Sequence, residues 1–280
     1  DETKQLILLQ MRLPRLVLGI LIGALLATSG VVVQSVFLNP LADPYIIGIA
    51  SAATFGAVIA YLLGLSDVFY GIFAFLSASA LSIVIFKLAA HTRSISTLLI
   101  VGIAVSSFLG AFTSFAVYLI GEDSFRITAW MMGYLGGANW QKIALLLPPL
   151  LFCMTYFYAK RHELNIILNG DEEAKSLGLN VEKSKKSLLI VSSLIIGFSV
   201  AFTGMIGFVG LIIPHTLRMA LRTSSNAVLI PASALTGGIF LLFCDVIAKN
   251  ILSPVEIPIG VVTSFFGAPF FLYLAFRKHA

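Results

Sequence analysis

The side chains able to carry out chemistry are few in this 280-residue chain, and no catalytic set can be assembled from them. The chain has no Gly-Lys dipeptide, so it lacks the phosphate-binding loop of nucleotide hydrolases. His162-Glu163 is not followed by a second histidine at zinc-binding spacing. Asp245 is the one acid well inside an apolar run, and a single acid makes no acid–base pair. We therefore expect no catalytic residue, no metal site and no cofactor bound by this chain.

Charge is concentrated in one segment, residues 160–186, which holds 11 of the 31 charged side chains. Placing these charges in lipid would cost about 3 kcal/mol each, so the segment is predicted to be an aqueous loop. Its centre, from Asp171 to Gly178, is typical of a short helix with acids in the first turn and a glycine stop. The loop is either a solvated connector or a docking element for a soluble partner.

The composition indicates the class of protein. Hydrophobic residues make up 59% of the chain and charged residues 11%, with a mean hydropathy of +1.00. Soluble domains carry about 25% charged residues, so a soluble globular protein, a disordered chain and a nucleic-acid binder are excluded. Cys153 and Cys244 lie in apolar runs, which argues against a disulfide framework. We predict an all-α polytopic membrane protein.

Membrane-spanning helices need about 20 apolar residues. Runs of this kind cover residues 13–37, 45–65, 68–90, 97–120, 143–159, 187–221, 227–249 and 257–276. The run at 187–221 is too long for one crossing and is predicted to break near Thr203-Gly204. About nine crossings result, all within a single transmembrane domain of residues 1–280 that contains the loop 160–186.

The basic residues predict the orientation of the chain in the membrane. If the charged loop is cytoplasmic, twelve of the 18 Lys and Arg residues lie inside and six lie outside. The inside set beyond the loop is Lys87, Arg93, Arg218, Arg222, Arg277 and Lys278. The outside set is Lys4, Arg12, Arg15, Arg126, Lys142 and Lys249. The chain is therefore predicted to start outside and end inside.

A faint internal repeat predicts two pseudo-symmetric halves. It relates Gly23, Ala27, Gly30 and Pro40 to Gly197, Ala201, Gly204 and Pro214 at a constant offset of 174 residues. A second pairing relates Gly102, Ser106 and Phe108 to Gly260, Ser264 and Phe266. Helices broken at matching points of two halves are typical of transporters. The glycine groups 19/23, 133/137 and 204/207/210 are expected to bring helix backbones into close contact.

Two proline-containing stretches, residues 39–44 and 213–218, are expected to interrupt helices. The first stretch is either a simple turn or part of a transport pathway. In the second, His215 is either a proton relay or a hydrogen-bonded polar residue.

In their order along the chain, these motifs resemble the permeases of type II ABC importers, the family that takes up vitamin B12, iron–siderophore complexes and haem. They run from Met11-Arg12-Leu13-Pro14-Arg15 through 23–30, Gln34, 39–44, 102–104, 130–133, 174–179, 204–215, Asp245, 256–260 and 267–269. The resemblance implies ten transmembrane helices per subunit and a permease dimer, with a homodimer favoured. The family's first helix precedes the Arg-Leu-Pro-Arg stretch, so this chain is expected to lack it.

The resemblance also implies partners. Two cytoplasmic ATPase subunits would bind ATP and Mg²⁺, and a periplasmic or lipid-anchored substrate-binding protein would dock on the other side of the bacterial cytoplasmic (inner) membrane. ATP closure of the ATPase pair would then drive alternating access in the permease.

Roles for single residues follow from the same resemblance. Docking of the binding protein is assigned to Arg12, Arg15 and Lys249, the last being a lysine where a close relative has arginine. ATPase coupling is assigned to Asp171, Glu172, Glu173, Ala174, Lys175, Ser176, Leu177, Gly178 and Leu179. The translocation gate is assigned to Asn39, Leu41, Ser94, Ile95, Ser96 and Thr97, with Ile95 at a position that is polar in a relative.

The expected function is ATP-driven uptake of a metal chelate. An iron–siderophore complex is the first candidate, haem the second and vitamin B12 the third, and an oxyanion stays open. No cluster of His, Met or acidic residues along the predicted pathway would bind a bare metal ion. An ion-coupled secondary transporter is the alternative, but it would need a coupling site, and we expect Asp245 to hydrogen-bond a neighbouring helix instead. An intramembrane enzyme is disfavoured because no catalytic pair is present.

Overall fold

The computed structural model describes residues 2–92 and 95–277, and these residues form helices and their connections, with no strand among them. The long helices are α2 (Leu13–Val36), α4 (Asp67–Thr92), α5 (Ile95–Ile120), α7 (Trp140–Ala159), α10 (Val181–Thr203), α12 (Asn226–Asn250) and α13 (Ile259–Arg277). Two shorter apolar helices are α3 (Ile49–Leu62) and α11 (Val209–Leu221). Short elements complete the order: α1 (Glu2–Ile7), η1 (Leu8–Arg12), η2 (Pro44–Ile47), η3 (Gly121–Ser124), α6 (Phe125–Met131), α8 (Arg161–Ile167) and α9 (Asp171–Ser176). The predicted all-α class is confirmed.

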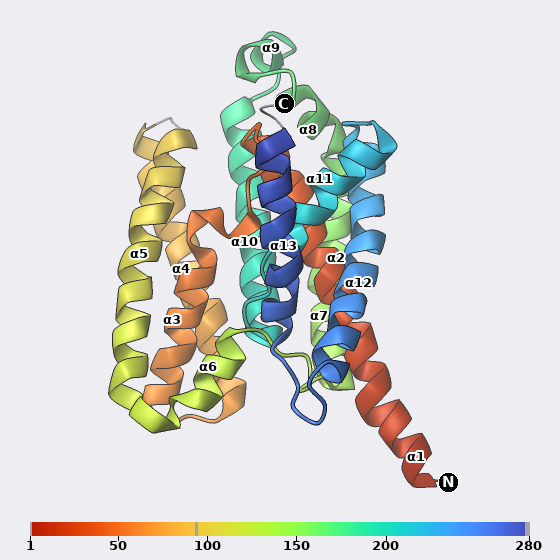
Figure 1. The fold of residues 1–280 in the computed structure, drawn as a ribbon. Coiled ribbons are helices and arrows are strands. Elements are labelled where there is room, and N and C mark those ends of the chain that lie inside the picture. Colours follow the sequence, from red (N-terminus) through yellow and green to blue (C-terminus); the bar gives the residue numbers. More distant parts are fainter. Residues whose placement is uncertain (1, 93–94, 278–280) are drawn as a thin grey trace.

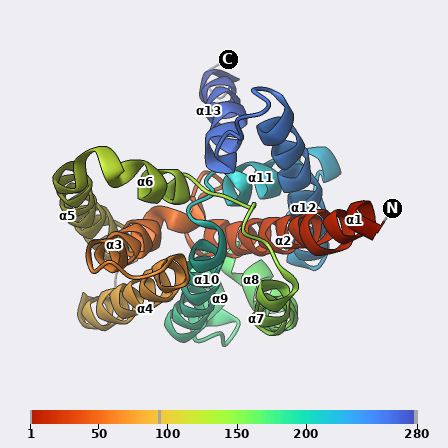
Figure 2. The same ribbon diagram turned by 90° about the horizontal axis from the view of Figure 1, so that it is seen from below.

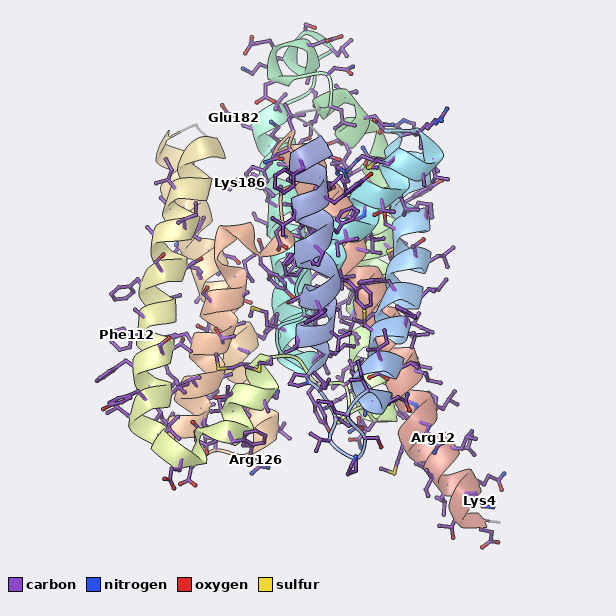
Figure 3. All side chains as sticks on the ribbon, in the orientation of Figure 1. Lys4, Arg12, Phe112, Arg126, Glu182 and Lys186 are labelled. Carbon is purple, nitrogen blue, oxygen red and sulfur yellow. The ribbon has the colours of Figure 1, made fainter. Side chains whose placement is uncertain are left out.

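Six helices in the described part of the chain are long and apolar enough to cross a membrane, and three shorter apolar helices accompany them. Their sum agrees with the nine crossings expected. Glu182 and Lys186 lie at the end of the bundle that carries α9, and Lys4, Arg12 and Arg126 lie at the opposite end (Figure 3). This separation follows the predicted charge pattern, while the cytoplasmic assignment of the α9 end stays a prediction. Arg93 and Lys278 lie outside the described residues.

α2 lies at the centre of the bundle and packs on α7, α10, α11 and α12 (Figures 1 and 2). Every residue from 22 to 36 is buried, so this helix has no polar face to orient it. A Cβ atom on Gly23 would lie 2.2 Å from the carbonyl oxygen of Gly237 on α12. One on Gly30 would lie 1.7 Å from the carbonyl oxygen of Gly210 on α11. Only glycine permits these backbone approaches, which confirms the predicted packing role of Gly23 and Gly210.

Other glycines of the predicted groups do not lie on helix faces. Gly133 and Gly137 belong to the connection between α6 and α7, and Gly204 and Gly207 belong to the break between α10 and α11. Gly133 and Gly204 have φ angles of +89° and +68°, so glycine serves backbone conformation there. The predicted placement on a helix face was therefore wrong for these four positions. The expected close backbone contact does occur at two of them, because a Cβ atom on Gly133 would lie 2.8 Å from the carbonyl oxygen of Met205 and one on Gly204 would lie 2.0 Å from that of Trp130.

The two halves, α2–α5 and α10–α13, repeat the same pattern of helices. Their lengths are 24, 14, 26 and 26 residues in the first half and 23, 13, 25 and 19 in the second. The contacts between the halves also correspond. The first helix of each half packs on the third helix of the other half, because α2 packs on α12 and α10 packs on α4. The offset of 174 residues is wrong, however. It aligns Gly30, inside the continuous α2, with Gly204, where α10 ends.

The second pairing of the repeat has a structural counterpart. The hydroxyl of Ser106 on α5 donates to the carbonyl oxygen of Gly102, and that of Ser264 on α13 donates to the carbonyl oxygen of Gly260, both at 2.7 Å. The same side-chain-to-backbone bond therefore occurs at equivalent places in the two halves.

The predicted start of the first helix was wrong. The helix begins at Glu2 and runs through Pro14, which has no N–H to donate. The chain accommodates the proline by widening into the π turn η1, in which the N–H of Leu13 donates to the carbonyl oxygen of Leu8.

Other boundaries also differ from the prediction. The run 45–65 divides into η2 and α3 at Gly48, which has a φ of +84°. α10 begins at Val181, inside the predicted loop, because the Asn180 side chain accepts from the N–H of Lys183 and caps it. The helix α6 was not predicted. The break near Thr203-Gly204 is confirmed.

Candidate functional site

Four charged side chains meet at the end of the bundle opposite α9. Arg15 on α2 donates from Nε and Nη2 to the carboxylate of Asp245 on α12, over 2.8 to 3.2 Å. Its Nη1 donates to both carboxylate oxygens of Glu256, in the connection from α12 to α13, at 2.9 and 3.1 Å. Lys249 Nζ lies 2.8 Å from Asp245 Oδ2. We call Arg15, Asp245, Lys249 and Glu256 the ion-pair cluster.

Burial is graded across the ion-pair cluster. The side chain of Asp245 is 2% exposed, that of Arg15 11% and that of Glu256 38%. A carboxylate this deeply buried is tolerated because it is paired and hydrogen-bonded. The expectation that Asp245 bonds to a neighbouring helix is confirmed. Arg15 and Lys249 are both ion-paired within the chain, and their role in docking stays a prediction.

The third predicted docking residue, Arg12, lies one turn before Arg15 and is exposed. It belongs to the π turn η1, whose widened hydrogen bonding frees the carbonyl of Leu9. Trp140 Nε1 donates to that carbonyl oxygen at 3.0 Å, so the opened turn is capped from α7. A π turn set into an α-helix often marks a functional position.

A second proline-induced opening lies in α11. Pro214 cannot donate to the carbonyl of Gly210, and Gln34 of α2 fills this place. Gln34 Nε2 donates to the carbonyl oxygens of Gly210 and Leu211 at 3.4 and 3.2 Å. Its Oε1 accepts from Arg218 Nη1 on the same helix. One amide therefore joins the central helix to both sides of the opening.

His215, next to this opening, packs edge-on against Phe270 of α13 with 6.0 Å between ring centroids. This contact leaves the choice between a proton relay and a structural histidine untested.

The gate residues Asn39 and Leu41 lie in the turn that follows α2, at the α9 end. Asn39 Oδ1 accepts from the N–H of Leu41 at 2.9 Å, and both side chains are exposed. Leu38, with a φ of +51°, begins this turn, and η2 follows after Asp43 accepts from the N–H of Tyr45. The stretch 39–44 is therefore a well-bonded turn, and a part in the pathway stays a prediction.

The other predicted gate residues lie where α4 and α5 meet. Ser94 is outside the described residues. Ile95, Ser96 and Thr97 form the first turn of α5. Their place at the α9 end agrees with the prediction, and their function is untested.

The coupling residues form a helical projection at one end of the bundle (Figure 1). α9 carries Asp171, Glu172 and Glu173 in its first turn and ends before Gly178, whose φ is +84°, as predicted. Ala174 is buried against the protein, while Leu177 is 62% exposed. An exposed leucine on a projecting, otherwise charged helix suits insertion into a partner's cleft.

Two polar contacts tie this projection to the membrane helices. Lys185 Nζ on α10 lies 2.5 Å from Asp171 Oδ1, although the lysine itself is buried. Glu163 on α8 accepts from Lys160 and from Ser184 on α10. Burial raises the pKa of Glu163, but these hydrogen bonds outweigh burial and hold that pKa below its usual range. The projection is therefore mechanically joined to α10.

A concavity of about 350 Å³ opens where α9 meets α10. It is lined by Lys175, Gly178, Leu179, Asn180, Val181 and Glu182. The concavity lies next to the exposed Leu177, so the two together form one continuous surface at this end of the bundle.

No group of three or more His, Cys, Asp or Glu side chains arranged to hold a metal ion occurs among the residues that the structure describes. The functional features are thus an ion-pair cluster at one end, a projecting helix at the other, a capped proline opening in η1 at the ion-pair end and a second opening in α11 bridged by Gln34.

Comparison with known proteins identifies this arrangement. The model of the FecCD transport family matches residues 1–277. The chain belongs to the FecCD transport family. This FecCD chain is 42% identical to the cobalamin import system permease protein BtuC of Halobacterium salinarum, over 98% of the chain and 74% of the relative. It is 37% identical to the hemin transport system permease protein HmuU of Yersinia pestis, over 96% of the chain and 83% of the relative.

A solved structure agrees with these relatives. A metal-chelate type ABC transporter in an inward-facing conformation superposes with a TM-score of 0.92 and 32% identity, covering 99% of this chain and 89% of that one. The FecCD chain is therefore a multi-pass permease of a type II ABC importer in the inner membrane. Membership implies ATPase and substrate-binding partners. It also decides against the ion-coupled secondary transporter.

Sequence reasoning missed several contacts of these sites. The pairing of Asp245 with Lys249 has the helical i,i+4 spacing and was open to prediction. The contacts of Arg15 with Glu256 and of Gln34 with Arg218 join residues more than 180 positions apart, so the local sequence pattern could not predict them.

Proposed function

We propose that this FecCD permease moves a metal chelate from a substrate-binding protein into the cytoplasm by alternating access, driven by ATP hydrolysis on two separate ATPase subunits. The observation that carries the proposal is the projecting helix α9 with its tether to α10. A short helix exposed on one side and bonded to a membrane helix on the other is suited to pass movement from a soluble partner into the bundle.

The coupling step would run through two contacts. Closure of the ATPase pair would push α9 through the exposed Leu177, and the ion pair of Asp171 with Lys185 would carry the displacement into α10. Because the α10–α11 break packs on η2 through the hydrogen bond of Tyr45 to the carbonyl of Ile206, the turn bearing Asn39 and Leu41 would move with it. ATP can shift the equilibrium between the two permease conformations only if the ATP-loaded ATPase subunits bind one conformation more tightly than the other.

At the opposite end, Arg12, Arg15 and Lys249 would receive acidic side chains of the binding protein. Arg15 and Lys249 lie on α2 and α12, the two helices interlocked at Gly23 and Gly237, which would connect docking to the core of the bundle.

The cargo we propose is a metal chelate. The resemblance placed an iron–siderophore complex first, and the relatives named for cobalamin and hemin add metal-bearing tetrapyrroles as equal candidates. We further propose that the permease acts as a homodimer, because exposed phenylalanines on α13 offer apolar surface to a second copy.

Reconstitution tests the proposal. The permease, its ATPase and its binding protein are placed in liposomes, and ATP-dependent uptake is measured with an iron–siderophore complex, haem and cobalamin in turn. A variant with residues 173–179 replaced by a Gly-Ser linker should lose ATPase binding and uptake. A matched variant, Glu122→Gln at the opposite end, should retain both.

Uptake of one chelate that needs ATP and the intact α9 would support the proposal. Uptake unchanged in the linker variant would overturn the coupling role of α9. Uptake that persists without any ATPase would overturn the mechanism itself.

A further inference from the structure

The guanidinium of Arg15 is shared between two acids of different character. Its Nε–Nη2 edge faces Asp245, which is 2% exposed, and its Nη1 faces Glu256, which is 38% exposed. Asp245 also holds Lys249 and is enclosed by α2 and α12. The inner acid is therefore a permanent partner, whereas the outer one lies at the surface of the ion-pair cluster.

The position of Glu256 in the chain permits its side chain to move away from Arg15. It lies in the exposed connection 251–256, after the end of α12 and before α13 begins. Its pair with Arg15 is a partly exposed ion pair, and such pairs contribute little to stability because solvent screens them. The contact of Arg15 with the Tyr134 ring, 6.0 Å from guanidinium carbon to ring centroid, and its bonds to Asp245 would hold the arginine in place without Glu256.

We propose that Glu256 is an internal stand-in for the carboxylate of a docking partner, which must be displaced before the acidic side chain of a substrate-binding protein can bind Arg15. This inference rests on the proposed docking function. The incoming carboxylate takes the two hydrogen bonds from Nη1 that Glu256 holds, while Asp245 keeps the opposite edge of the guanidinium in the same orientation.

Two consequences follow from charge. With Glu256 in place the ion-pair cluster is neutral, since two bases face two acids, so it attracts an acidic partner weakly at long range. Once Glu256 has moved away, the cluster has a net charge of +1 and an exposed, pre-oriented Nη1. Docking is therefore weakened in the resting permease, which suits a binding protein that must also be released.

The test measures binding of the substrate-free binding protein to the permease–ATPase complex in lipid nanodiscs by surface plasmon resonance. Glu256→Gln should tighten binding about three- to fivefold, mostly through faster association, because no internal acid has to be displaced first and the cluster then attracts an acidic partner. Glu122→Gln removes the same charge from an exposed position on η3 at the same end, and should change binding less than twofold. Glu256→Asp, with a shorter reach toward Arg15, should tighten binding to an intermediate degree.

The outcomes separate this inference from the docking proposal. If the binding protein binds wild type but Glu256→Gln binds equally or more weakly, the displacement is wrong and docking stands. Equal tightening by Glu122→Gln would show a general charge effect and would also overturn the displacement. If Arg12→Ala and Arg15→Ala leave wild-type affinity unchanged, the docking role itself fails.

Discussion

α2 and α5 are both apolar helices, of 24 and 26 residues, yet they occupy opposite environments in this permease. In the most apolar stretch of each span, 78% of the residues are buried at α2 and 17% at α5. α2 lies among its neighbours at the centre, and α5 lies at the edge beside α3 and α4 (Figure 2). Hydropathy measures the free energy of transfer out of water, and lipid tails and a protein interior are both apolar. It therefore does not distinguish a helix that faces lipid from one that is buried in protein.

What separates the two helices is shape. α2 presents glycines to the backbones of α11 and α12, whereas α5 presents Phe108, Phe112 and Phe115 outward, each more than half exposed. Buried polar contacts follow the same division, because Arg15 and Gln34 of α2 reach across to other helices. Ser106 and Ser107 of α5, by contrast, bond to their own helix. Four predictions test this contrast.

The largest effect is expected from filling a glycine contact. Gly30→Leu on α2 should abolish the folded protein, because its Cβ would lie 1.7 Å from a backbone oxygen that cannot move away. Gly110→Leu on α5 should fold normally, since nothing lies within 4 Å of its Cβ position. Size-exclusion chromatography in detergent measures both. A monodisperse, wild-type profile for Gly30→Leu would break the contrast.

The ion-pair cluster should give the next largest effect. Asp245→Asn removes the charge that faces Arg15 and Lys249, and should cost about 3–5 kcal/mol of stability. Arg15→Met combined with Asp245→Leu should recover much of that loss, because no unpaired charge stays buried. Thermal unfolding in detergent compares the variants, with Glu122→Gln beside α5 as the control. A double variant that is no more stable than Asp245→Asn would contradict the pairing.

Gln34→Leu should have an intermediate effect. It leaves the Gly210 carbonyl and Arg218 without the bonds that Gln34 supplies, at about 1–3 kcal/mol. Ser107→Ala on α5 should change stability by less than about 0.5 kcal/mol, because its hydroxyl bonds only to the Ile103 carbonyl of its own helix. Unfolding of both variants is followed by tryptophan fluorescence. Equal losses would show that polar contacts of α2 carry no special weight.

The smallest effect is expected on the outer face. Phe115→Ala on α5 should cost less than about 1 kcal/mol, since the ring is 57% exposed and lipid replaces its contacts. Ile22→Ala on α2, at a fully buried position, should cost about 2–5 kcal/mol. Hydrogen exchange of the two helices, read by mass spectrometry, sharpens the comparison. A loss at Phe115 matching that at Ile22 would place α5 in a protein interface.

Several features were open to prediction because they depend on local sequence. The charge density of residues 160–186 predicted that this segment lies outside the membrane, because burying charges in lipid is costly. The glycine after Leu177 predicted the end of the projecting helix, because a residue in the left-handed conformation ends a helix. The break after Thr203 followed from a run too long for one crossing. The turn at residues 39–44 was also open to prediction, but the expected interruption at residues 213–218 was wrong because α11 continues through Pro214. The prediction that the first helix begins at residue 13 failed because Trp140 caps the widened turn before Pro14.

The sequence by itself determined the class of this protein, the number of crossings and the two ends that carry its charges, because each depends on how much of a segment can leave water. Only the tertiary structure decided which helix lies at the centre and which acid neutralises Arg15. Those choices depend on shape and pairing between residues more than 200 positions apart, such as Gly23 with Gly237 and Arg15 with Asp245. In an apolar surrounding, hydropathy is nearly the same for every partner, so close contact and charge pairing select among them.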